Sequence, residues 1–260
     1  MSFLLVSFKN IIRRIIKIIL MYILPIFIGL YTTRIFFLWD SKKIYSHKNV
    51  KVYTDNNAYT DTLAWLEIIN ECHSLLESKG IKMRSTTIRV FSSFESMKKL
   101  KGGYITAAYF PLADVIIVGP LDLEKRKNVP YQTLKARSIS SILAHEMTHI
   151  NQYYTIPFKA IKNDWRLEGQ AEYIANNSSI DTTLGVKLFT ENTDELKDML
   201  KKGGADAASY YYFLYRLRTD YLIRHKEESY DNFFDTEYNL DSLDKEIRTA
   251  LVNNEYTFSN

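Results

Sequence analysis

Hydrophobic residues follow three successive patterns along this chain. The first is a continuous run, because residues 18–33 carry no charged side chain and apolar residues resume at 35–39, directly after Arg34. From Lys43 onward the apolar residues occur in short alternating runs of strand length, and beyond Pro130 they recur mostly at helical spacing. The chain is therefore expected to hold an apolar N-terminal segment, a strand-rich part and a helical part.

The N-terminal run has almost the length of a membrane-spanning helix, which needs roughly 20 apolar residues. The basic residues in front of it are Lys9, Arg13, Arg14 and Lys17. A cleaved signal peptide has the same order of basic and apolar residues but needs small residues at its cleavage site, and no alanine precedes Ala58. A second alternative is a helix that lies in the plane of the membrane surface, because three of the basic residues recur every four positions on one face.

An uncleaved signal anchor fits these features best. We expect residues 1–40 to form a single-pass membrane anchor that contacts the bilayer through residues 9–39. Arg34, Lys42 and Lys43 follow the span and favour the reverse orientation, but the four basic residues in front of it favour an N-terminus inside the cell. The rest of the chain is therefore predicted to face outward, in an extracytoplasmic location.

Strand and helix signals alternate between residues 41 and 156. Strands are expected at 48–54 and 86–93, and a hairpin-like pair of strands at 107–120. A helix is expected at 60–80 because its leucines and isoleucines lie near helical spacing. These elements predict a small mixed β-sheet with a helix packed on it.

Helical patterns dominate after Pro130. The expected helices are 131–154, 164–176, 207–226 and 242–254. We therefore predict an α+β fold: an N-terminal lobe at 41–156 that ends in a long helix, and a mainly helical C-terminal lobe at 157–260.

Composition argues against some classes of binding partner and site. The 260 residues include 25% charged and 46% hydrophobic side chains, which is ordinary for a globular protein, and the formal net charge is +4. No array of basic and aromatic residues indicates nucleic acid, so no nucleic-acid partner is expected. Cys72 is the only cysteine, which makes an intramolecular disulfide impossible and disfavours a cysteine-ligated structural zinc.

The candidate chemistry lies in the segment LAHEMTHINQ, residues 143–152. His145 and His149 are four residues apart, so their side chains lie one above the other on a helix and could reach one metal ion. Glu146 is rotated by about 100° along the helix, where it would flank the ion as a general base and not bind it. Two histidines that merely satisfy their hydrogen bonds within a helix remain the alternative at this point.

A catalytic zinc needs a third protein ligand and an open position. The residues after His149 are Ile-Asn-Gln-Tyr, which excludes the metzincin continuation. Further along, WRLEGQAEY at 165–173 offers Glu168, separated from His149 by eighteen residues, enough chain for a loop and a returning helix. Glu172, one turn later, is placed to accept the second N–H of a ligating histidine.

The two motifs together resemble those of the gluzincin metallopeptidases, and most closely the bacterial peptidase MA-like domains. The resemblance is strong over 143–175 and fainter over 50–230. It implies a zincin-like fold, one zinc ion on His145, His149 and Glu168, and Glu146 as base and proton shuttle. Glu172 would orient a ligand histidine.

The resemblance has further implications for the substrate cleft. The strand at 115–118 would be the edge strand that pairs with an extended peptide, and the tyrosine-rich helix would supply the donor to the oxyanion. Tyr211 or Tyr212 is the expected donor, with His225 as a weaker alternative. Leu167 precedes Glu168 where thermolysins and aminopeptidases carry asparagine, which argues for an endopeptidase over an exopeptidase.

The sequence therefore predicts a membrane-anchored, zinc-dependent metallopeptidase that hydrolyses peptide bonds of a peptide or protein substrate. The rival hypothesis is a catalytically inactive zincin-fold module, tethered to the membrane for binding or assembly, because fold does not dictate function. A purely structural zinc site is disfavoured, because three protein ligands beside Glu146 leave an open position with a base next to it.

Overall fold

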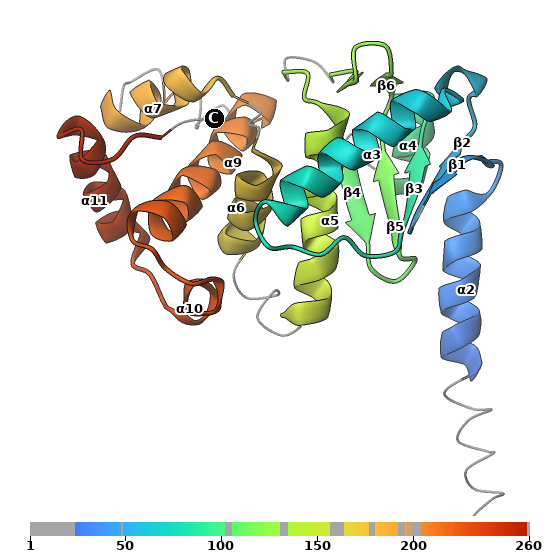
Figure 1. The fold of residues 1–260 in the computed structure, drawn as a ribbon, viewed down its shortest axis with the longest axis horizontal. Helices are drawn as coiled ribbons and strands as arrows, with labels where there is room; N and C mark the ends of the chain where they lie inside the picture. The colour runs from blue at the N-terminus through green and yellow to red at the C-terminus, as the bar shows by residue number, and fades with distance from the viewer. Residues whose placement is uncertain are drawn as a thin grey trace, which may run out of the picture.

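The computed structural model describes residues 24–47, 49–101, 106–130, 135–156, 164–176, 180–191, 196, 198 and 204–258. The fold is α+β, with a mixed sheet and its covering helices on one side and a group of helices on the other (Figure 1).

The strands and helices have the following bounds. The strands are β1 (Lys42–His47), β2 (Val50–Thr54), β3 (Thr86–Val90), β4 (Ala107–Phe110), β5 (Val115–Val118), β6 (Leu121–Asp122) and β7 (Lys127–Asn128). The helices are α2 (Leu24–Leu38), the 3₁₀ turn η2 (Asn57–Tyr59), α3 (Thr62–Glu77), α4 (Phe94–Lys101), α5 (Ile139–Thr155), α6 (Asp164–Ala175), α7 (Thr182–Glu191), α9 (Gly204–Asp220), the π-helical turn η4 (Tyr221–His225), α10 (Tyr230–Asp235) and α11 (Leu240–Val252).

The main sheet has five strands in the order β1-β2-β3-β5-β4. The three inner strands are parallel, and β1 and β4 pair antiparallel at the two edges. Alternate residues of β5 face opposite cores: Ile116 packs with α3 and α5, while Ile117 packs with Phe37 of α2 and Met97 of α4. Coverage on both faces explains why the Val-Ile-Ile-Val run is apolar throughout.

The edge of the sheet differs from the prediction. The antiparallel pair expected at 107–120 is confirmed as β4 and β5, with Ala107 opposite Val118. However, β5 has strand neighbours on both sides, so the prediction that 115–118 forms the edge was wrong. Of this pair the edge strand is β4, because β5 lies between β4 and β3 in the sheet. The strand β1 was not predicted, since its sequence is mostly polar and exposed.

Helix α5 begins later than the predicted start at 131. Its N-cap is Ser138, whose side chain accepts a hydrogen bond from the Ser141 N–H. The three residues before this cap belong to no helix or strand, and Arg137 among them reaches across to α6. Helices at 164–176, 207–226 and 242–254 are confirmed in type and place, whereas α7 and α10 were not predicted.

Helix α6 lies between two apolar cores. Tyr173 and Ile174 belong to the core under the sheet, together with α3 and α5. Trp165 and Leu167 pack against the second core, formed by α7, α9, η4, α10 and α11. The returning helix is thereby fixed from both sides, which fixes the side chains it directs at α5.

The described part of the chain contains no helix that is both long and apolar enough to span a bilayer. Residues 1–23 of the predicted anchor lie outside the described residues, and α2 accounts for most of its remainder. The single-pass anchor at 1–40 stays a prediction.

Candidate metal centre

The centre is formed where α6 returns against α5. The motif helix α5 is buried along nearly its whole length, so His145 and Glu146 belong to the interior of the fold. Helix α6 approaches α9 closely at Gly169, where an added Cβ would lie 2.6 Å from the Tyr215 carbonyl oxygen and still closer to the Thr219 hydroxyl. Gly169 thus permits the close contact of α6 with α9.

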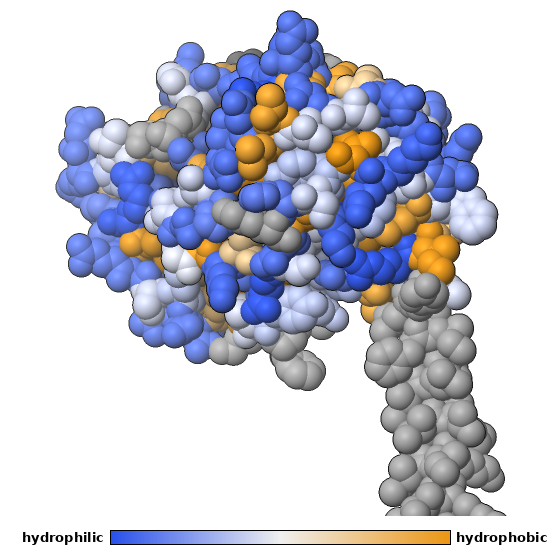
Figure 2. All heavy atoms as spheres, turned by 45° about the vertical axis from the view of Figure 1, so that its right-hand side comes forward, coloured by the Kyte–Doolittle hydropathy of each residue, from blue (hydrophilic) through white to orange (hydrophobic). Residues whose placement is uncertain are grey.

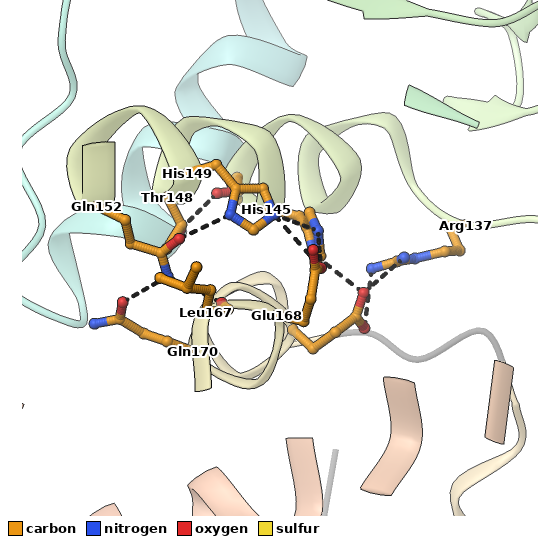
Figure 3. A network of polar contacts seen from close by, with 10 residues as sticks. Arg137, His145, Thr148, His149, Gln152, Leu167, Glu168 and Gln170 are labelled. Carbon is orange, nitrogen blue, oxygen red and sulfur yellow. Dashed lines mark hydrogen bonds and ion pairs between the residues drawn. The ribbon is translucent and has the colours of Figure 1, made fainter. Parts of the chain in front are cut away.

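Three side-chain atoms converge between the two helices (Figure 3). The Nε2 atoms of His145 and His149 are 3.1 Å apart. Oε2 of Glu168 lies 3.2 Å from Nε2 of His145 and 3.5 Å from Nε2 of His149. The spacing of four residues on α5 and the return of α6 therefore bring together the three predicted metal ligands.

The triangle of donor atoms fits a tetrahedral metal ion. Zinc–nitrogen and zinc–oxygen bonds of about 2.0–2.1 Å place two ligands of a tetrahedron about 3.3–3.4 Å apart, close to the three separations in this site. Oε2 of Glu168 is buried and has no aligned hydrogen bond among the described residues. A buried carboxylate oxygen of this kind, next to two imidazole nitrogens, is the donor chemistry that a divalent cation requires.

The second nitrogen of His145 faces an acidic side chain. Nδ1 of His145 lies 3.1 Å from Oε1 of Glu172, as the sequence predicted, although its N–H is not well aligned with that oxygen. Glu172 is in turn held by Arg137 through two contacts, Nη1 to Oε1 at 2.9 Å and Nη2 to Oε2 at 3.2 Å. Both side chains are nearly inaccessible to solvent. Glu172 thereby favours a proton on Nδ1, and Nε2 is the nitrogen that faces the common point.

The second nitrogen of His149 has a neutral partner. Nδ1 of His149 donates to Oε1 of Gln152 at 2.7 Å. The amide of Gln152 is oriented by its own two donations, to the Leu167 carbonyl at 2.9 Å and to Oε1 of Gln170 at 2.8 Å. In both histidines the partner of Nδ1 therefore orients the ring so that Nε2 points at the common point.

Glu146 and Tyr212 share one cavity with the three converging residues. The cavity has a volume of about 370 Å³, and its wall on the sheet side is β4 with Pro111. Tyr212 lies with its ring centre 6.4 Å from that of His145. Tyr211 is exposed and stacks on Tyr215 outside the cavity.

Of the two predicted tyrosines, the structure thus brings only Tyr212 to the site. His225, the weaker alternative, packs against Tyr221 and Tyr256 and is not among the residues that line the cavity.

The ionisable side chains of the centre shift one another's pKa values. Burial alone would lower the pKa of His145, but contacts with Glu168 and Glu172 outweigh it and raise the pKa to about 10. Burial would raise the pKa of Glu168, yet its contacts with the two histidines hold that pKa well below its usual range. Burial, and then the charge of Glu168, raises the pKa of Tyr212, so its phenol keeps its proton and can donate it in a hydrogen bond.

Two contributors were not found from the sequence. Arg137 lies 35 residues before Glu172, and no spacing rule connects them. Gln152 lies three residues after His149 on the same helix face, a spacing that could have indicated the contact. The chain matches no protein-family model and no curated protein. The gluzincin resemblance therefore rests on the two sequence motifs alone.

Proposed function

We propose that this protein is a zinc-dependent endopeptidase of the gluzincin type with a zincin-like fold. The observation that carries the proposal is the convergence of His145, His149 and Glu168 on one point, inside a cavity that Glu146 also lines. Two histidines and one carboxylate are the ligand set of several catalytic zinc sites, which keep a fourth position for water or substrate.

A zinc ion bound at this point would acidify a water molecule and polarise the carbonyl group of the substrate. Glu146 accepts the proton of the attacking water on its carboxylate and delivers it to the nitrogen of the leaving amine. The phenol of Tyr212 donates a hydrogen bond to the carbonyl oxygen as negative charge develops there. Arg137, Glu172 and Gln152 keep the two histidine rings in the productive orientation.

The substrate backbone is proposed to pair with β4. This strand is the edge of the sheet, and Ala107, Ala108 and Tyr109 line the cavity. Backbone groups on the open side of an edge strand can bind an extended peptide by strand addition. We also propose that residues 1–40 anchor the protein in a membrane with its site on the extracytoplasmic side. Protease accessibility of the site-bearing domain in intact cells would test this orientation.

The decisive experiment compares wild type, Glu146→Gln and the surface control Glu255→Gln on a broad peptide library, together with the zinc content of each protein. We expect stoichiometric zinc in all three and cleavage by wild type and the control only. Wild type without zinc would contradict the proposal at its first step. Zinc without any cleavage, or a biological function that survives in Glu146→Gln, would favour the inactive binding or assembly module instead.

A further inference from the structure

Large apolar side chains are exposed around one end of the fold. We name Ile35, Phe36, Leu112, Tyr153 and Tyr154 the apolar rim; all are exposed in the structure. Figure 2 shows hydrophobic side chains gathered where α2 joins the rest of the fold. An exposed cluster of this kind marks a surface that contacts something other than water.

Neighbouring aromatic side chains lie between the members of the rim. Phe37 of α2 packs on Phe110, beside the turn that carries Leu112, with ring centres 4.6 Å apart. Tyr109 of β4 contacts Tyr153 at the end of α5, with ring centres 6.5 Å apart. In Figure 1 the β4–β5 turn and the C-terminal end of α5 point to the same side as the N-terminal end of α2. The β4–β5 turn and the end of α5 thus carry their rim residues on that side, while Ile35 and Phe36 lie in the last turn of α2, near its attachment to the fold.

Helix α2 is attached to the fold at this same place. Arg34 donates to the Thr87 hydroxyl at 2.7 Å and lies 4.0 Å from Asp114, which follows Leu112 by two residues. Arg89 donates to the backbone carbonyls of Phe37 and Trp39 at the end of the helix. These contacts fix the direction of α2 relative to the rim.

The chain itself indicates what covers the rim. Arg34 is the first charged residue after Lys17, so the sequence that leads into α2 is uncharged over residues 18–33. Helix α2 leaves the fold on the side of the rim, and an uncharged sequence of this length would direct that side toward a bilayer. Tyrosine rings suit the interfacial zone of a membrane, and Arg84, stacked 4.7 Å over the Tyr154 ring, adds a positive charge that suits anionic headgroups.

We propose that the apolar rim rests in the interfacial zone of the membrane, so that the candidate metal centre opens next to the bilayer surface. Tyr153 follows His149 by one helical turn, about 6 Å of rise. Strand β4 runs toward the rim, and an extended peptide paired with it runs along the same line. The substrate class is therefore the extended juxtamembrane segment of a membrane-embedded protein, an inference that rests on the proposed peptidase function.

The docking is tested without any reference to activity. The full chain is reconstituted into vesicles of phosphatidylcholine and phosphatidylglycerol, and a nitroxide label is attached to one introduced cysteine at a time. Cys72 does not interfere, because it is fully buried and burial raises the pKa of its thiol. The rim positions are Leu112→Cys and Tyr154→Cys. The matched controls are Leu63→Cys and Val252→Cys, on the ends of α3 and α11 that face away from the rim.

Leu63 and Val252 are 71% and 65% exposed, comparable with 67% for Leu112, so the labels differ only in where they lie. We expect the labels at 112 and 154 to collide with dissolved oxygen more than with a water-soluble nickel complex, and the control labels to show the reverse. Equal accessibility to the nickel complex at all four positions would overturn the docking. A change that depends on protein concentration and not on lipid would show that a second copy covers the rim.

The substrate class is tested by distance from the membrane. One cleavable sequence is placed about 5 or about 25 extended residues, roughly 17 or 80 Å, from a membrane-spanning helix in the same vesicles. We expect the near segment to be cleaved about tenfold faster, since it is held at high effective concentration beside the cavity. The double variant Phe36→Ser/Leu112→Ser should bring the ratio toward one while cleavage of the free peptide stays unchanged.

The outcomes separate the two proposals. Equal cleavage of near, far and free peptides overturns the juxtamembrane substrate class and leaves the peptidase function standing. Cleavage of none of them overturns the peptidase function, and with it the substrate class, while the label accessibilities still decide whether the rim is docked.

Discussion

The ring of His149 donates from Nδ1 to Oε1 of Gln152 at 2.7 Å, and Gln152 is itself held by two further hydrogen bonds to α6. One glutamine on the motif helix therefore fixes the tautomer of a proposed ligand and joins α5 to α6. The ring of His145 is oriented in the same way by a charged pair, because its Nδ1 contacts Glu172 and Glu172 is held by Arg137. The two proposed histidine ligands are thus supported by a neutral network and an ionic one.

Gln152→Leu removes the acceptor for His149 Nδ1 and keeps the side chain of similar size. We expect zinc affinity to fall about 10–100-fold, because the imidazole loses the partner that orients it. Competition titration against a chelating dye measures the affinity. Asn151→Leu, one position earlier on α5 and outside the cavity lining, serves as the control, and equal losses in the two variants would contradict the assigned role.

Arg137→Met leaves the buried carboxylate of Glu172 without its cation. We expect the free energy of unfolding to fall by about 3–5 kcal/mol, the usual cost of removing one partner from a buried ion pair. Urea unfolding followed by circular dichroism measures the change. The double variant Arg137→Met/Glu172→Gln should recover part of the loss, since it removes the unpaired charge; a double variant no more stable than the single one would contradict this explanation.

Gly169→Ala places a methyl group against the Tyr215 carbonyl of α9, where backbone cannot move aside at low cost. We expect a loss of about 1–3 kcal/mol in the free energy of unfolding, as for other overpacked contacts. Gly29→Ala is the matched control, because an added Cβ there meets nothing within 4 Å. A neutral Gly169→Ala variant would show that α6 can separate from α9 freely.

Tyr212→Phe removes the proposed donor to the oxyanion while retaining the ring that packs beside His145. We expect kcat to fall about 100-fold or more with little change in zinc content, as when one oxyanion donor is lost elsewhere. Tyr211→Phe should keep nearly full activity, because that side chain lies outside the cavity. Steady-state kinetics on a cleaved peptide distinguish the two, and similar kcat values for both variants would exclude the donor role.

Removal of the metal should destabilise the protein by mass action. An ion that binds only the folded state adds about 2.7 kcal/mol at a hundredfold excess over its Kd. We therefore expect a strong chelator to lower the melting temperature of wild type and added zinc to restore it. The variant His149→Ala should melt at the same temperature with and without chelator. A wild-type melting temperature that ignores both chelator and zinc would show that no ion binds at this centre.

Most of the site residues could be predicted from local spacing in the sequence. His145, Glu146 and His149 were predictable because a helix repeats every 3.6 residues, and this period alone fixes which side chains share a face. Glu168 and Glu172 followed from the same rule applied to the second helix. The antiparallel pair at 107–120 was also predictable, since strand length and the turn between the runs are local signals.

Other features depend on contacts between segments that are distant in sequence. The edge position of β4 depends on which strand pairs with β3, and both strands of the pair look equally apolar in sequence. The choice of Tyr212 over Tyr211 depends on the rotation of α9, which its packing against α6 at Gly169 decides. The ion pair of Arg137 with Glu172 joins the segment before α5 to α6, across a separation of 35 residues in the chain.

The sequence by itself determined the periodic elements and the residues of the candidate metal centre, because both follow from the spacing of neighbouring residues along a helix or strand. The tertiary structure alone decided which strand edge faces the cavity, which tyrosine enters it and which side chains hold the two histidine rings. The physical reason is that burial, close packing and charge pairing act between surfaces that meet only when the chain has folded.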